Sequence, residues 1–128
     1  MTWAGLLFAT LASLIHVYIF VLESLRWSDP KTMATFGITE ATVDATKPLA
    51  YNQGFYNLFL AAMGLLGVGL YLAGEETVGV TLALAGTASM ALAGLVLITS
   101  SPDKARAALI QMVPAALAVI CLVWGVVA

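Results

Sequence analysis

The side chains with the clearest chemistry in this 128-residue chain are His16 and Glu23, seven residues apart in its first apolar stretch. Seven residues make two turns of an α-helix, so both side chains are expected on one face. At ~1.5 Å per residue, His16 lies about 10 Å from the level of Glu23 along the helix. An imidazole and a carboxylate placed in this way can act as a general acid and base. His16 and Glu23 are therefore the candidate catalytic residues.

A second set of polar side chains opens the next apolar stretch and enters the last one. Asn52 and Tyr56 are one helical turn apart, and so are Gln53 and Asn57. Amides and a phenol can orient a polar headgroup attached to an apolar ligand. The candidate ligand-binding residues are Asn52, Gln53, Tyr56, Asn57 and Gln111.

Each candidate also has a purely structural interpretation. Amide side chains between membrane helices often only hold the helices together, at roughly 0.6 kcal/mol per contact. Glu23 could pair with Arg26 at the next helical turn, and His16 could be a satisfied core histidine. No metal site is predicted, because the single His and the scattered Met residues lack ligand spacing. The cofactor stays unknown, and the lone Cys121 leaves its redox role open.

The composition predicts an integral membrane protein. Hydrophobic residues make up 62% of the chain and charged residues only 9%, whereas soluble domains carry about 25% charged residues. The net charge of −2 gives no reason to expect a nucleic-acid partner. No Lys or Arg precedes Arg26, so we do not expect a cleaved signal peptide.

Four apolar stretches, each close to the ~20 residues that a helix needs to cross a bilayer, follow one another. They cover about residues 3–25, 49–73, 78–99 and 105–127. Stretches of this length in lipid must be helices, because strands would leave an unpaired edge. The two short connections force neighbouring helices to run antiparallel. The predicted fold is all-α: a single membrane domain over residues 1–128, built as a four-helix bundle with one longer loop.

The longer loop, residues 26–48, is expected to carry short interfacial helices. Asp29 and Pro30 are typical of a helix start, Gly37 of a helix stop, and Thr39 could cap a second short helix. The loop could be a linker lying on the headgroups or a lid over a pocket, and the linker is the preferred interpretation.

The basic residues predict the orientation. They are Arg26, Lys31, Lys47, Lys104 and Arg106. All belong to the first and third connections, which lie on one side of a four-span protein, so this side is predicted to be cytoplasmic. Both termini should then be extracytoplasmic. Small faces around Gly64, Gly67 and Gly86 allow close helix contacts, within one chain or in a homo-oligomer.

All seven candidate residues fall in the predicted cytoplasmic half of the bundle, while a channel needs polar groups at all depths. The sequence therefore predicts a polar pocket there, binding or acting on a small amphipathic or lipid-like molecule. One alternative is a small proton-coupled exporter using Glu23. Small multidrug exporters also have four helices and a first-helix glutamate, but theirs lies deeper. Another alternative is a structural membrane subunit without a ligand. An enzymatic reaction, its substrate and the oligomeric state stay open.

Several segments resemble a family of small bacterial membrane proteins known as domain of unknown function 1304. They are His16 to Glu23 with Trp27, then Phe36-Gly37, the run Asn52-Gln-Gly-Phe-Tyr-Asn57 with Phe59-Leu-Ala-Ala, and Gln111-Met-Val-Pro-Ala-Ala. The Asn-Gln-Gly-x-Tyr-Asn run is the most specific of these. The resemblance implies four helices in a bacterial plasma (inner) membrane and no established activity. Its motifs contain all seven candidate residues.

Overall fold

A computed structural model describes all 128 residues, and the chain is helical almost throughout. The elements are α1 (Thr2–Phe20), the π-helix η1 (Val21–Leu25), α2 (Pro30–Phe36), α3 (Val43–Leu72), α4 (Glu76–Ser100), the 3₁₀ turn η2 (Pro102–Lys104) and α5 (Ala105–Val127). The helical stretches α1–η1, α3, α4 and η2–α5 are long and apolar enough to cross a membrane. The predicted all-α membrane fold is confirmed.

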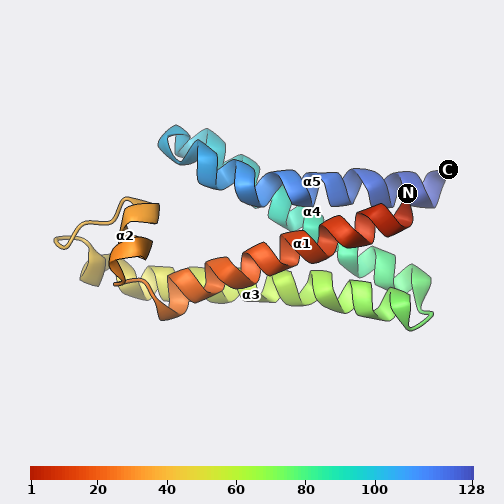
Figure 1. Ribbon diagram of the computed structural model, residues 1–128, viewed down its shortest axis with the longest axis horizontal. Coiled ribbons are helices and arrows are strands. Elements are labelled where there is room, and N and C mark those ends of the chain that lie inside the picture. The colour runs from red at the N-terminus through yellow and green to blue at the C-terminus, as the bar shows by residue number, and fades with distance from the viewer.

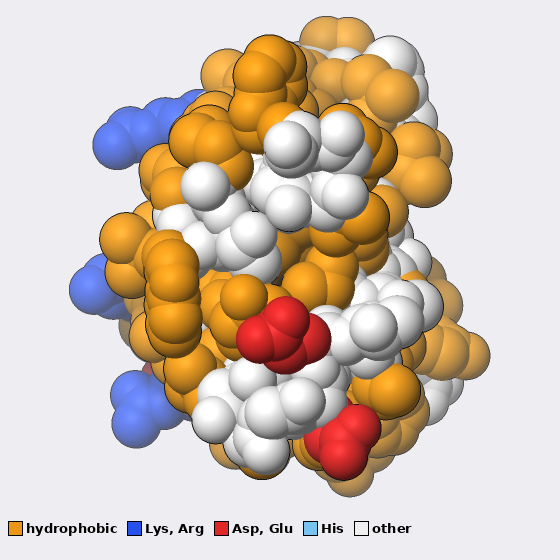
Figure 2. Space-filling view, turned by 90° about the vertical axis from the view of Figure 1, so that its right-hand side faces the viewer, with side chains coloured by type: hydrophobic (Ala, Val, Ile, Leu, Met, Phe, Trp, Pro, Cys, Tyr) orange, Lys and Arg blue, Asp and Glu red, His pale blue; other side chains and the backbone are white.

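The four long helices form a closed ring in which α1 packs on α3 and α5, and α4 packs on the same two helices. Figure 1 shows the two termini and the α3–α4 turn at one end of the bundle, called here the terminal end. The other end holds α2 and the α4–α5 connection, together with all five Lys and Arg residues, and is called the basic end. Figure 2 looks onto the terminal end, where acidic side chains lie among hydrophobic and uncharged ones.

Small residues set the distance between the helices. A Cβ atom added to Gly67 of α3 would lie 2.7 Å from the carbonyl oxygen of Gly79 and 2.8 Å from the Cα of Ala83, both in α4. The backbones of α3 and α4 therefore touch at this point, as the glycine faces predicted. Fully buried alanines fill the remaining helix contacts: Ala9, Ala12, Ala61, Ala83, Ala108, Ala115 and Ala118.

Helix α3 differs most from the expected boundaries, because it begins at Val43, six residues before the expected start at residue 49. The separate short helix expected after Thr39 does not form, and Thr42 is the N-cap of α3 instead. Pro48 lies inside the helix, where its missing N–H removes one backbone hydrogen bond. A hydropathy pattern ends where polar residues begin, whereas helical hydrogen bonding continues through them.

Helix α2 has the boundaries that its sequence predicts. Asp29 is the N-cap, Pro30 the first helical residue, and Gly37 ends the helix in the left-handed conformation with φ of 68°. The buried Trp27 attaches α2 to the bundle, since its ring lies 5.2 Å from that of Phe36. The indole Nε1–H also donates a 3.0 Å hydrogen bond to Thr46 in the first turns of α3. This places α2 across the basic end.

Candidate functional site

A partly open cavity of about 250 Å³ lies at the basic end, lined by residues of α1, η1, α2, α3, α4 and α5. We call it the inner cavity. Its polar lining comes from Tyr18, Glu23, Thr35, Gln53, Asn57 and Gln111. The rest of the wall is made of Ile, Leu, Phe and Ala side chains. Four of the seven candidate residues, Glu23, Gln53, Asn57 and Gln111, thus reach one space.

Glu23 is held by a hydrogen bond between helices. The Asn57 Nδ2 amide donates to Glu23 Oε2 at 2.8 Å, and it also lies 3.2 Å from the carbonyl oxygen of Gln53. Glu23 forms no ion pair with Arg26, whose guanidinium lies 3.6 Å from the Asp29 carboxylate instead. The carboxylate therefore contacts an uncharged partner in the cavity and not the cation that the structural interpretation assigned to it.

The close approach of η1 to α3 places Glu23 at the cavity. A Cβ atom on Gly54 would lie 3.0 Å from the backbone nitrogen of Ser24 and 3.1 Å from the Cβ of Glu23. The Ser24 hydroxyl donates a 2.8 Å hydrogen bond to the carbonyl oxygen of Tyr51 in α3. Only glycine at position 54 leaves room for this contact.

His16 lies elsewhere and does not line the inner cavity. The side chain is fully buried, and its Nδ1 lies 2.8 Å from the carbonyl oxygen of Ala12. Since a carbonyl only accepts, Nδ1 carries the proton of this bond, and Nε2 has no partner. The neighbouring Ser13 hydroxyl is likewise buried without a partner.

A π-helix begins between the two candidate catalytic residues. A π-turn closes its hydrogen bonds over five residues instead of four, so it contains an extra residue. The turn at Val21–Leu25 follows His16 and contains Glu23. Ile15 and Leu22, at the same seven-residue spacing, both line the inner cavity, whereas of His16 and Glu23 only Glu23 reaches it.

Asn52 and Tyr56 lie outside the inner cavity, on an exposed face of α3. The Tyr56 side chain is 64% exposed, in a part of the helix that would face lipid. The structure thus brings only one of the two one-turn pairs, Gln53 and Asn57, to the cavity. The sequence reasoning missed Thr35 of α2, because no local pattern shows that α2 folds over the cavity mouth.

A groove of about 600 Å³ adjoins the inner cavity between the end of α2 and the α4–α5 connection. We call it the basic groove. Asp103, Lys104 and Arg106 supply its charged groups. The groove and the cavity share four lining residues, Thr35, Phe36, Ala107 and Ile110. They are therefore neighbouring parts of one depression beside α2.

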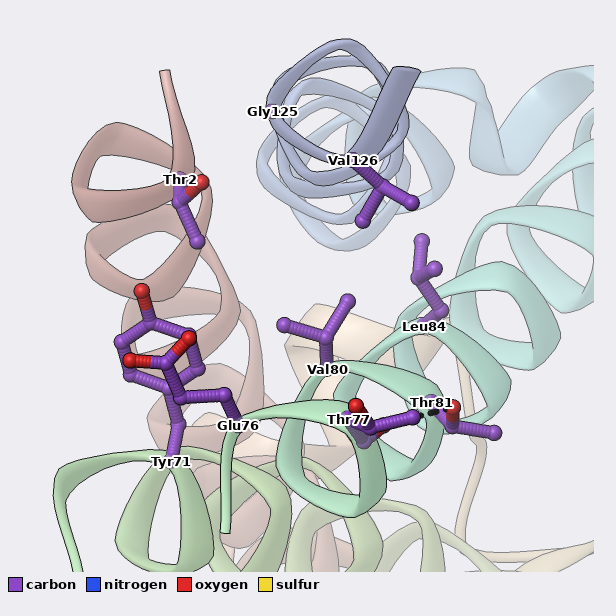
Figure 3. A pocket seen from close by; sticks show the side chains of 9 residues that line it. All are labelled: Thr2, Tyr71, Glu76, Thr77, Val80, Thr81, Leu84, Gly125 and Val126. Carbon is purple, nitrogen blue, oxygen red and sulfur yellow. Dashed lines mark hydrogen bonds between the residues drawn. The ribbon is translucent and has the colours of Figure 1, made fainter. Parts of the chain in front are cut away.

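A separate hollow of about 320 Å³ lies at the terminal end, between the first turn of α1, the last turns of α3 and α5, and the start of α4. Figure 3 shows its polar groups: the hydroxyls of Thr2, Thr77 and Thr81, the Tyr71 phenol and the Glu76 carboxylate. The sequence predicted only helix packing in this half of the bundle. Each helix contributes only one or a few residues from its end to the hollow, so no single segment shows a polar cluster. No three His, Cys, Asp or Glu side chains gather anywhere in the structure, so none is assigned to a metal ion.

Four membrane-length helices with a polar cavity at one end define a small four-helix integral membrane protein. A family model described as a protein of unknown function, DUF1304, matches residues 10–123, so the chain belongs to this family. The match covers all seven candidate residues and confirms the resemblance seen in the sequence. No curated protein and no solved structure matches the chain.

Proposed function

We propose that the protein binds, or acts on, a small amphipathic or lipid-like molecule in the inner cavity. The proposal rests on the composition of this cavity. Four polar candidate residues reach it, namely Glu23, Gln53, Asn57 and Gln111, and most of its remaining wall is apolar. Ligand pockets have this composition, with a few polar groups that fix orientation. About 250 Å³ suits a headgroup or a short chain, so the rest of a lipid would stay in the bilayer.

The charge distribution supports one orientation of the site. All five Lys and Arg residues lie at the basic end, beside the inner cavity, and the terminal end has none. On the positive-inside rule we propose that the basic end faces the cytoplasm and that both termini lie outside, in a bacterial plasma membrane. In this orientation a ligand enters from the inner leaflet or the cytoplasm.

Proton-coupled export through Glu23 is the second candidate. It is favoured by the position of the carboxylate in a cavity, bonded to a second helix through Asn57. Two buried apolar clusters lie between the basic and terminal ends: Leu6 with Ala83 and Leu122, and Ala12 with Met90 and Ala115. Neither cluster contains an Asp, Glu, Lys, Arg or His side chain, which supports binding over transport.

The test is native mass spectrometry of the detergent-purified protein, searching for retained small molecules. Asn57→Ala removes an amide from the cavity, and Asn52→Ala makes the same change outside it. We expect the retained molecule to be lost in Asn57→Ala and kept in Asn52→Ala. The proposal fails if the wild type retains nothing and no added amphiphile raises its melting temperature. Equal losses in both variants would show that the site lies elsewhere.

A further inference from the structure

The two adjoining spaces beside α2 carry charges of opposite sign. The inner cavity contains one ionisable carboxylate, Glu23, and the basic groove contains Lys104 and Arg106 with a single acid, Asp103. The four residues lining both spaces make the cavity and the groove direct neighbours, so a molecule that reaches both would meet both signs of charge. A ligand that matches this arrangement needs a positive group, a negative group and an apolar part.

The hydrogen-bonding groups that have no partner within the chain narrow the class of positive group that the ligand can carry. Glu23 Oε2 accepts from Asn57, while Oε1 has no partner within the chain. The side chains of Gln53 and Gln111 also line the cavity, and the amide of each can supply a further acceptor. A primary ammonium group has three donors and matches these acceptors, whereas a quaternary ammonium has none.

The cations of the basic groove are also free. Neither Lys104 nor Arg106 forms an ion pair, because the only ion pair in the structure joins Arg26 to Asp29. A guanidinium and an ammonium are the usual partners of phosphate oxygens. With Asp103 in the same groove, its formal charge is +1, which matches a phosphodiester carrying one negative charge.

We infer that the inner cavity and the basic groove together recognise a phospholipid with a zwitterionic headgroup that ends in a primary ammonium. The ammonium binds at Glu23, the phosphodiester at Lys104 and Arg106, and the glycerol and acyl chains leave along the apolar wall. The inference rests on the proposed function and names the ligand class of the same site.

Binding of three lipids with identical short acyl chains tests this in detergent, by calorimetry or native mass spectrometry. Phosphatidylethanolamine is expected to bind about tenfold more tightly than phosphatidylcholine or phosphatidylglycerol, because only it forms the charge-assisted bonds to Glu23. Glu23→Gln should abolish this preference. The double variant Lys104→Gln with Arg106→Gln should weaken all three lipids by about tenfold. Lys31→Gln with Lys47→Gln is the matched control at the same end but outside both spaces, and should change nothing.

The comparison of the three lipids uses the wild-type protein, so it gives a result even if a variant fails to fold. Equal affinity for the three lipids, or a preference that survives in a folded Glu23→Gln variant, overturns the inference and leaves the proposed function standing. An equal loss in the Lys31 and Lys47 control would assign the basic groove to general surface charge and also overturn it. Failure of every amphiphile to bind would remove the proposed function itself.

Discussion

Replacing Gly67 by alanine tests the contact that sets the spacing of α3 and α4. The added Cβ would lie 2.7 Å from the Gly79 carbonyl oxygen and 2.8 Å from the Ala83 Cα, where ordinary contact begins near 3.4 Å. These atoms, and the Ala83 backbone nitrogen that lies closer still, belong to the backbone and cannot turn away, so the two helices must separate. Gly69, two residues further along the same helix, is the control, because a Cβ atom added there would meet no other atom within 4 Å.

The size of the effect follows from two opposing terms. Alanine stabilises a helix by about 1 kcal/mol over glycine, and both variants gain this term. A gap of 0.5–1 Å removes a quarter to a half of the dispersion energy of the contacts that it opens. Overpacking a close contact typically costs about 1–3 kcal/mol. We therefore expect Gly67→Ala to destabilise by up to about 2 kcal/mol and Gly69→Ala to stabilise by up to about 1 kcal/mol.

The measurement is unfolding by dodecyl sulfate in mixed micelles, followed by circular dichroism. Gly79→Ala should reproduce the loss of Gly67→Ala, since its Cβ would lie 2.7 Å from the Gly67 carbonyl oxygen. A free energy of unfolding for Gly67→Ala within about 0.5 kcal/mol of that for Gly69→Ala would refute the reasoning. It would mean that the helices have room at this contact.

Three further predictions concern other contacts. Gly64→Ala should destabilise by up to about 2 kcal/mol, because its Cβ meets the Ser13 hydroxyl. Most of this loss of stability should vanish when Ser13 is also replaced by alanine. Thermal unfolding measures it, and losses that simply add in the double variant would contradict the prediction. Asn57→Ala should lower the free energy of unfolding by about 0.6–2 kcal/mol, and by much less when Glu23 is already replaced by alanine. If Asn57→Ala costs the same free energy in both backgrounds, the hydrogen bond between Asn57 and Glu23 contributes nothing. Trp27→Phe should keep the ring contact with Phe36 but lose the indole hydrogen bond to Thr46. Amide hydrogen exchange in residues 30–36 should then speed up, while the four long helices stay protected. Unchanged exchange in residues 30–36 would show that the indole hydrogen bond does not hold α2 in place.

The helices themselves could be predicted from the sequence, since hydropathy alone separates the four spans. The ends of α2 could be predicted as well, because Asp29-Pro30 and Gly37 fix them through local backbone geometry. The start of α3 could not, because polar residues after Val43 carry no hydropathy signal for a helix. Periodicity also relates residues to one another without showing which face points inward.

Because spacing does not show which helix face points inward, it could not separate the candidate residues that line the cavity from those that do not. Gln53 and Asn57 face the inner cavity, while Asn52 and Tyr56, with the same one-turn spacing, lie on the exposed face. The face of α3 that points inward is fixed by Gly54 against η1, a tertiary contact that spacing does not reveal. The catalytic roles suggested for His16 and Glu23 stay predictions, and the structure places the two residues apart.

The π-helix at Val21–Leu25 has a consequence for the family's evolution. A π-turn arises when one residue is inserted into an α-helix, and its loss restores a regular turn without disturbing the rest of the span. A relative one residue shorter between the positions of His16 and Arg26 would keep the fold but turn its acidic side chain away from the cavity. Within the family, the length of this segment and the presence of a carboxylate at the position of Glu23 should therefore vary together.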